Sequence, residues 1–183
     1  MIPEKYKWLE TIGTLPKMVA AALQYMGIKE VPGKGSNPVI IDMAKGLGIQ
    51  DIYTDDDMSW CALFINHLIR ITGKPILQIG HDPYNYLRAK YMVNWGVNVA
   101  KGDEKLGDVL IFDREGGGHV GLLIAQSGAT YHVLGGNQSN SVTITEISKA
   151  RLLGVRRFYA TAPPASAIAY EMDSTGKLST NEA

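Results

Sequence analysis

One cysteine and four histidines are the residues of this sequence best suited to nucleophilic chemistry. Cys61 is the only cysteine, so an intrachain disulfide and a multi-cysteine zinc site are excluded. It stands where an acidic loop meets the apolar segment "CALFINHLIRITGK", which has helical spacing. Unpaired N–H groups at a helix start favour a thiolate. This position predicts a nucleophile with a lowered pKa, against the alternative of a small buried hydrophobic residue.

A thiol nucleophile requires a base within hydrogen-bonding distance. His67 follows Cys61 by six positions on the same expected helix, which places it away from the thiol. His81 lies in an expected loop. His119 follows three glycines and opens an apolar strand, whereas His132 lies inside the next strand. The end of a strand is a common place for a catalytic side chain, so we expect His119 to be the base.

The turn between these two strands indicates which residue orients the base. A turn centred on Ser127-Gly128 makes paired positions sum to about 255. His119 then lies opposite about position 136, one place from Asn137, whereas His132 lies well down the hairpin. This register favours a Cys61–His119–Asn137 arrangement, in which the Asn137 carboxamide accepts a hydrogen bond from the imidazole N–H. His132 stays open as the alternative third residue.

The elements that position these residues indicate an α+β fold. Helices are expected over residues 16–27, 37–48, 61–73 and 82–96, with Asn37 and Asp82 as N-caps. After residue 100, short β-branched and apolar runs separated by turn residues predict about five antiparallel strands, with the helices packed on the sheet. We expect a lead-in over 1–15, a catalytic domain over 16–160, and a flexible or docked tail over 161–183.

Composition narrows the functional classes. The formal net charge is zero, which argues against a nucleic-acid partner. No apolar run approaches the ~20 residues needed to cross a bilayer, and the N-terminus lacks the features of a signal peptide. We therefore expect a protein made in the cytoplasm and without membrane insertion. The sequence does not give the oligomeric state, and we favour a monomer. We expect neither a metal nor another cofactor; Asp55, Asp56 and Asp57 are expected to be loop or helix-start residues.

Three blocks, "SWCALFINHLI", "LGDVLIFDREGGGHVGLLIA" and "YHVLGGNQSNSVTI", resemble a phage and bacterial branch of the NlpC-like and CHAP (cysteine, histidine-dependent amidohydrolase/peptidase) hydrolases. The resemblance covers roughly residues 16 to 158. It implies a papain-like fold and a peptidoglycan substrate, cut at a peptide or amide bond. Cys61 matches the nucleophile, His119 the base and Asn137 the third residue. His132 matches the spacing of the third residue in the broader NlpC-like group.

The resemblance also suggests substrate contacts and a mechanism. Gln138 follows Asn137 in the same motif and is expected to position the loop or the substrate. Trp60 is expected either to line the substrate groove or to pack in the core, and Gly118 to give the backbone room near a ligand. The implied reaction proceeds through an acyl-enzyme, with the Cys61 N–H as an oxyanion donor.

Within this class we expect a phage lysin that depends on a separate factor for release. The alternatives are a virion-associated structural or injection component with a lysin-like domain, and a cysteine acyltransferase or toxin on the same scaffold.

Overall fold

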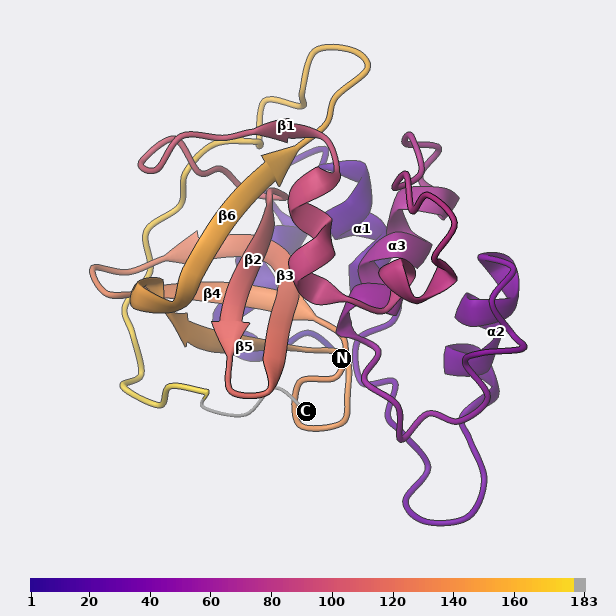
Figure 1. Ribbon diagram of the computed structural model, residues 1–183. Coiled ribbons are helices and arrows are strands. Elements are labelled where there is room, and N and C mark those ends of the chain that lie inside the picture. Colours follow the sequence, from indigo (N-terminus) through magenta and orange to yellow (C-terminus); the bar gives the residue numbers. More distant parts are fainter. Residues whose placement is uncertain (180–183) are drawn as a thin grey trace.

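The computed structural model describes residues 1–179 and has helices packed on a six-stranded antiparallel sheet (Figure 1). The helices are η1 (Glu4–Glu10), α1 (Lys17–Leu23), α2 (Pro38–Gly46), α3 (Cys61–Ile71), η2 (Pro83–Tyr86), η3 (Ala89–Asn94) and η4 (Lys149–Arg151). The strands are β1 (Val97–Asn98), β2 (Val109–Arg114), β3 (Gly117–Gln126), β4 (Thr130–Gly135), β5 (Thr143–Ser148) and β6 (Leu152–Arg157). They follow the order β1-β6-β2-β3-β4-β5. The predicted α+β class is confirmed.

The five expected strands are β2 to β6. The additional strand, β1, has only two residues and pairs with β6 through Val97 and Arg157. A run of two residues is too short to show the alternation on which strand prediction depends. Its presence follows from the exposed edge of β6, which offers backbone groups for pairing.

The first helices follow their local signals. The Asn37 side chain accepts a hydrogen bond from the Val39 N–H at 2.9 Å, and Pro38 occupies the first turn of α2, as expected. Helix α3 is followed by Gly73, whose φ of 69° suits glycine. In Figure 1, α3 lies between the sheet and α2.

The predicted single helix over residues 82–96 is wrong. Asp82 does cap the first turn by accepting from the Tyr84 N–H, but the chain then forms two short 3₁₀ helices, η2 and η3. Arg88 between them is extended, with φ −91° and ψ 104°, and its guanidinium donates to Asn85 and Asp82. At the far end, the Trp95 indole N–H donates to the Pro75 carbonyl at 2.8 Å. These contacts outside a regular helix outweigh helix propensity.

Residues alternate between two apolar clusters on the faces of the sheet. Val120 and Leu122 face the helices, where they pack with α3. Phe112 and Leu123 belong to the cluster on the opposite face. His119 also lies on this second side, next to Phe112 in the register, with the two rings 6.5 Å apart.

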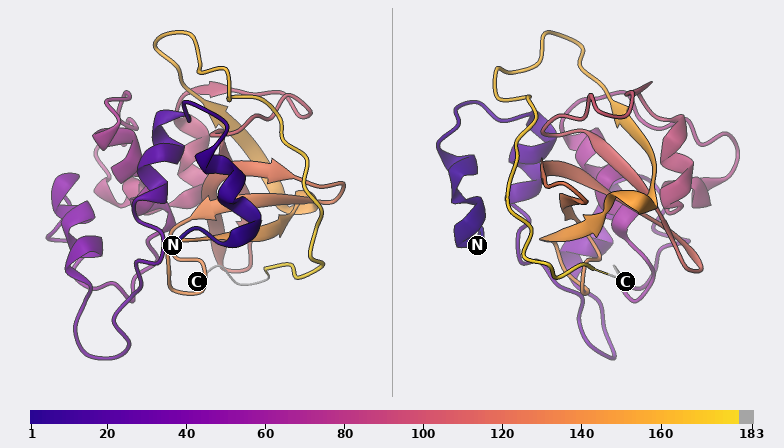
Figure 2. Two further views of the ribbon diagram at one scale, coloured as in Figure 1. Left: turned by 180° about the vertical axis from the view of Figure 1, so that it is seen from behind. Right: turned by 90° about the vertical axis from the view of Figure 1, so that its left-hand side faces the viewer.

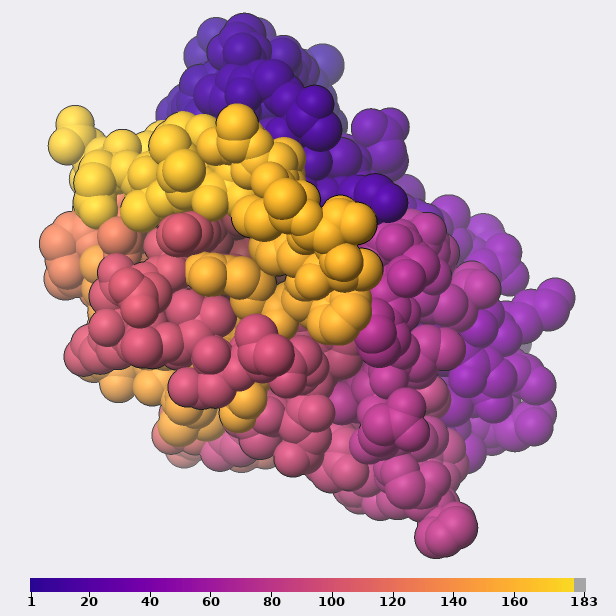
Figure 3. Space-filling model, turned by 90° about the horizontal axis from the view of Figure 1, so that it is seen from above, coloured from indigo at the N-terminus to yellow at the C-terminus, as the bar shows by residue number. Residues whose placement is uncertain are grey.

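Both terminal segments belong to the folded body. Tyr6 and Leu9 of η1 are each only 1% exposed, so the expected lead-in contributes to the core. Trp8 packs on Tyr170 of the C-terminal segment with ring centroids 4.7 Å apart. Figures 2 and 3 show the C-terminal segment running along the sheet and past the N-terminal residues. The expected tail is therefore docked over its described residues, 161–179; residues 180–183 lie outside them.

Backbone pairing holds the C-terminal segment in place. The N–H of Gln126 donates to the Tyr170 carbonyl at 2.9 Å, and the N–H of Met172 donates to the Gln126 carbonyl at 2.8 Å. Further along, the N–H of Ser179 donates to the Glu146 carbonyl at 2.8 Å.

Within residues 1–179, every helix is too short or too polar to cross a bilayer.

Candidate active site

Cys61 is the first residue of α3 and faces the start of β3. Its side chain is buried, and the backbone N–H of Val120, the residue after His119, is directed at the thiol. The sheet register therefore brings the strand that carries His119 to the beginning of the helix that carries Cys61. The Val120 N–H is thus the group of this strand that faces the thiol, whereas the His119 side chain lies beside Phe112 on the other face of the sheet. Direct contact between the His119 imidazole and the Cys61 thiol stays a prediction.

The pKa of the Cys61 thiol departs from the sequence expectation. Burial raises this pKa, because a thiolate loses its hydration inside the protein. The Val120 N–H and the positive charge of Arg114 act in the opposite direction but do not outweigh burial. The expectation of a lowered pKa is therefore wrong for the free protein. The thiol is protonated at neutral pH and requires a base to become a nucleophile.

Gln138 is the polar partner of His119. The Nε2 atom of His119 lies 3.0 Å from the Oε1 atom of Gln138, and both side chains are buried. The Nε2 atom of Gln138 donates to the carbonyl oxygens of Val133, at 3.1 Å, and Thr143, at 2.6 Å. These two bonds fix which end of the amide faces His119.

This amide orientation assigns the tautomer of His119. Because Gln138 presents its carbonyl oxygen, the Nε2 atom of His119 must carry the proton and donate it. In the neutral ring, Nδ1 is then the basic nitrogen. A carboxamide that orients the imidazole without adding charge is the role that the sequence analysis gave to Asn137.

The Asn137 side chain has a different environment from the one expected. The β3–β4 register gives Leu122 opposite Leu134, so paired positions sum to 256 (122 + 134) and the position level with His119 is 137 (256 − 119). However, β4 ends at Gly135, and Asn137 adopts a left-handed φ of 54°. The chain reverses there, and the side chain that returns to His119 is that of the next residue, Gln138. Within residues 1–179, the Asn137 side chain makes no hydrogen bond.

The turn that carries Gln138 leaves no space for larger residues. A Cβ atom on Gly135 would lie 3.0 Å from the Gln138 Oε1 and 3.3 Å from the His119 Nε2. A Cβ atom on Gly136 would lie 2.6 Å from the ring of Trp60. The two glycines of "LGGNQ" therefore allow the turn to approach both His119 and the start of α3.

Trp60 is part of the core. It is 0% exposed, packs edge-to-face on Phe64, and its indole N–H donates to the Glu30 carboxylate at 2.6 Å. Of the two roles considered from the sequence, groove lining and packing, this environment corresponds to packing. The residue thereby anchors the loop before α3 next to the "LGGNQ" turn.

His132 lies away from His119 along the hairpin. It pairs with Ala125, close to the β3–β4 turn, after a register shift between Leu123 and Ala125. Its Nδ1 atom is 2.8 Å from the Tyr6 hydroxyl and 3.8 Å from the Glu146 carboxylate. Its partners are thus residues of η1 and β5. The alternative in which His132 orients His119 has no support in this geometry.

The other two histidines are also separate from the site. His67 Nε2 lies 2.7 Å from the Tyr25 hydroxyl, and burial, aided by the charge of Arg70, lowers the pKa of His67 to about 4. His81 is exposed.

A pocket of about 330 Å³ opens beside Cys61. Its walls come from η3, the loop before it, and the β2–β3 turn, and Gly118 is among the lining residues. A Cβ atom on Gly118 would lie 2.7 Å from the Lys90 side chain, so glycine is needed for this close packing. Three cationic side chains line the pocket: Arg88, Lys90 and Arg114. The sequence did not single these out, because Arg114 lies far along the chain from Arg88 and Lys90 and the three residues form no motif.

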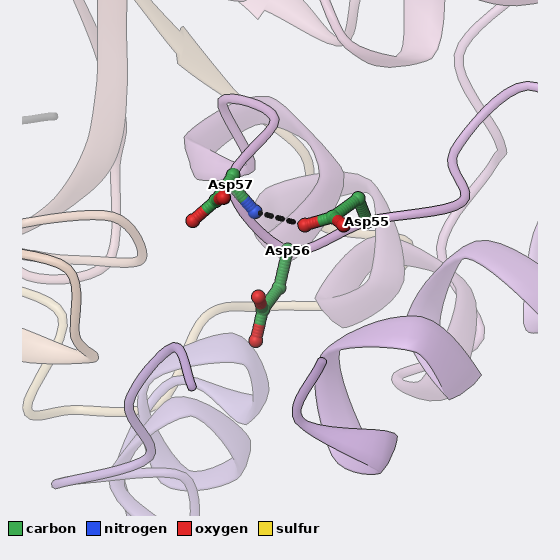
Figure 4. A group of neighbouring side chains, drawn as sticks. All are labelled: Asp55, Asp56 and Asp57. Atoms are coloured by element: carbon green, nitrogen blue, oxygen red, sulfur yellow. Dashed lines mark hydrogen bonds between the residues drawn. The ribbon is translucent and has the colours of Figure 1, made fainter. Parts of the chain in front are cut away.

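The three aspartates before α3 lie in the loop that precedes this helix, and two of them accept hydrogen bonds from backbone N–H groups. Asp56 is 0% exposed and its Oδ2 accepts from the backbone N–H groups of Val31, at 3.0 Å, and Asn37, at 2.7 Å. Figure 4 shows the Asp56 carboxylate extending away from the hydrogen bond between the Asp57 N–H and Asp55. The three carboxylates lie within 4.8 Å of one another. The hydrogen bonds of Asp55 and Asp56 are from backbone N–H groups, so both carboxylates fix the shape of this loop. Within residues 1–179, the Oδ1 atom of Asp56 is buried without a hydrogen-bond partner.

No protein-family model matches this chain, and no curated protein matches it either.

Proposed function

We propose that this protein is a cysteine hydrolase that cleaves a peptide or amide bond of peptidoglycan. The observation that carries the proposal is the buried Cys61 thiol at the start of α3, against the N–H of the residue next to His119, whose imidazole is oriented by Gln138. The peptidoglycan substrate is supported by the resemblance of the three sequence blocks to the NlpC-like and CHAP hydrolases. The papain-like arrangement is part of the same proposal.

The proposed reaction is an acyl transfer to Cys61 and then to water. His119 accepts the thiol proton as the sulfur attacks the scissile carbonyl carbon, and the carbonyl oxygen becomes an oxyanion. The Cys61 backbone N–H is an oxyanion donor. The C–N bond breaks, and His119 returns the proton to the leaving amine. His119 then removes a proton from water, whose oxygen attacks the thioester, and the thiol is regenerated.

The raised pKa of Cys61 fits this sequence of steps. A protonated thiol at rest requires the proton transfer to occur with substrate bound, and the orientation of His119 by Gln138 prepares the basic nitrogen for this step. Gln138 accordingly takes the third role, for which the sequence favoured Asn137. Gln138 acts through His119 and is a positioning residue.

Digestion of purified sacculi tests this proposal. We expect the wild-type protein to release soluble fragments, and Cys61→Ala, with unchanged thermal stability, to release none above background. Mass spectrometry of the fragments identifies the bond that is cut. Equal clearance by both proteins, or none by the wild type on sacculi of several wall chemistries, would falsify the hydrolase proposal. Transfer of an acyl group to an added amine instead of water would favour the acyltransferase alternative.

A further inference from the structure

The pocket beside Cys61 has a cationic lining. Its charged wall residues are Arg88, Lys90 and Arg114, and none of its lining residues is acidic. The remaining walls are apolar or glycine, apart from Ser59 and Cys61. A group that enters this pocket meets positive charge immediately next to the thiol.

Two of the three cations are neutralised by neighbours. Arg88 forms an ion pair with Asp82. Lys90 forms one with Asp113, with 2.6 Å between Nζ and Oδ1. Their carboxylates compensate most of the field that these side chains would otherwise project into the pocket.

Arg114 differs from both. Within residues 1–179 its side chain has neither an ion pair nor a hydrogen bond, and its Nε atom is buried without a partner. The side chain as a whole is half-buried, and its charge acts on the Cys61 thiol. A partly desolvated guanidinium without a partner is costly unless a ligand supplies one. It presents the planar pair of donors that a carboxylate accepts best.

The β2–β3 turn leaves room for such a ligand. Gly116, Gly117 and Gly118 line the pocket without side chains. A Cβ atom on Gly117 would meet only the Arg114 guanidinium, at 4.0 Å. A carboxylate that approaches over Gly116 and Gly117 therefore reaches the guanidinium without displacing a side chain, whereas Gly118 is covered by Lys90.

We propose that Arg114 binds a carboxylate of the substrate, so that the pocket selects an acidic residue next to the bond that Cys61 attacks. This assignment deepens the proposed function and, for its substrate, rests on it. Stem peptides of peptidoglycan carry carboxylates that some cell walls convert to carboxamides. The protein should therefore distinguish acid from amide at one position of the stem.

Alkylation of Cys61 tests the anion site independently of hydrolysis. Iodoacetate and iodoacetamide attack the same thiol but differ in charge. Relative to a neutral model thiol such as N-acetylcysteinamide, we expect wild-type protein to favour iodoacetate over iodoacetamide by about fivefold, because the reagent's carboxylate is attracted to Arg114. Arg114→Gln should reduce this preference to that of the model thiol.

Two matched variants sharpen the alkylation test. Arg88→Gln removes a cation that Asp82 already neutralises, so it should retain at least half of the preference. Arg114→Lys should retain much of it, because the charge remains. If Arg114→Gln fails to fold, Arg114→Met is a second neutral variant that keeps an apolar stem. No preference in the wild type, or an equal preference in a folded neutral variant, overturns the anion site.

Hydrolysis of paired muropeptides tests the identity of the ligand. The two substrates differ only by carboxylate or carboxamide next to the scissile bond. We expect the wild type to have an acid-over-amide ratio of kcat/KM of ten or more, and Arg114→Gln to lower that ratio toward one. A wild-type ratio near one contradicts carboxylate selection even where hydrolysis succeeds. Absence of hydrolysis with an intact alkylation preference rejects the proposed function and leaves the anion site standing.

Discussion

Two histidines on one hairpin, His119 and His132, are equally buried but have opposite surroundings. Each is 0% exposed, and each lies beside a polar side chain. His119, near the beginning of β3, donates to the neutral amide oxygen of Gln138, and the backbone N–H of the next residue, Val120, is directed at Cys61. His132, on β4, lies between Tyr6 and Glu146, on the side covered by both terminal segments.

Burial alone therefore does not distinguish the histidine that we propose as the base from a histidine that is held within the fold. The Glu146 carboxylate is fully used by the fold: it accepts from Lys5 at 3.0 Å, from the Ser174 hydroxyl at 2.6 Å, and from the Thr175 N–H and hydroxyl. That end of the hairpin is a polar joint between β5 and the C-terminal segment. At the other end of the hairpin, His119 lies 3.0 Å from the neutral amide of Gln138, and its neighbour Gly118 lines the pocket beside Cys61.

Replacement of the two histidines should give the largest contrast. We expect His119→Ala to lower turnover on sacculi by about 10²–10⁴-fold, because the thiol loses its base. His132→Ala should keep turnover within a few-fold in the folded fraction while lowering the melting temperature. Turnover and thermal melts of both variants check this pair. Comparable losses of turnover at equal stability would remove the distinction between the two histidines.

The residues after β4 give the next contrast. Gln138→Ala should lower turnover by roughly 100-fold, because His119 loses the partner that fixes its orientation. Asn137→Gly is the matched change, since glycine tolerates the positive φ at this position, and it should cost less than about fivefold. Steady-state kinetics on soluble muropeptides compare the two. The reverse ranking would return the orienting role to Asn137.

At the other end of the hairpin, Glu146→Ala should affect stability and leave chemistry intact. The change leaves Lys5, Ser174 and Thr175 without their acceptor, and we expect the free energy of unfolding to fall by about 3 kcal/mol. Urea denaturation measures this loss. The iodoacetamide rate of Cys61 should stay unchanged. A large change in that rate would show that the two ends are coupled.

The pKa values of His132 and Glu146, at this end of the hairpin, predict that the folded protein loses stability in acid. Burial lowers the pKa of His132, so the folded state binds fewer protons than the unfolded state below the ordinary value near 6.5. Burial alone would raise the pKa of Glu146, but hydrogen bonds from Ser174, Thr175 and Lys5 lower it to about 2. Its contribution is therefore complete above its ordinary pKa of 4.5 and is lost as the pH falls toward 2. Melting temperatures measured from pH 7 to pH 3 should decline, and less steeply below pH 4.5 for Glu146→Gln.

Ser174→Ala should give the smallest effect. It removes one of several hydrogen bonds to Glu146, so we expect a loss of about 1–2 kcal/mol in the free energy of unfolding. Hydrogen exchange at the Ser179 and Met172 amides, which bond to the sheet, would show whether the C-terminal segment loosens locally. A loss of unfolding free energy equal to that of Glu146→Ala would mean that the hydrogen bond from Ser174 accounts for the whole contribution of Glu146 to stability.

The sequence by itself determined the fold class and most of the elements, and it singled out Cys61 and His119 as the candidate pair. Helix periodicity after Cys61, the Asn37 cap and the alternating runs after residue 100 are local signals, and each produced the expected element. The hairpin arithmetic placed His119 opposite about position 136, one place from Asn137, and placed His132 far down the strands, because strand pairing repeats regularly from the turn. The observed register differs from this by one position.

Only the tertiary structure decided which side chains meet. One left-handed residue, Asn137, reverses the chain and brings Gln138 to His119, which no periodicity shows. Burial raised the pKa of Cys61 above what its place at a helix start indicated. The uncompensated charge of Arg114 depends on ion pairs that Asp82 and Asp113 give to other cations. Contacts between distant residues follow from packing, and local sequence does not encode them.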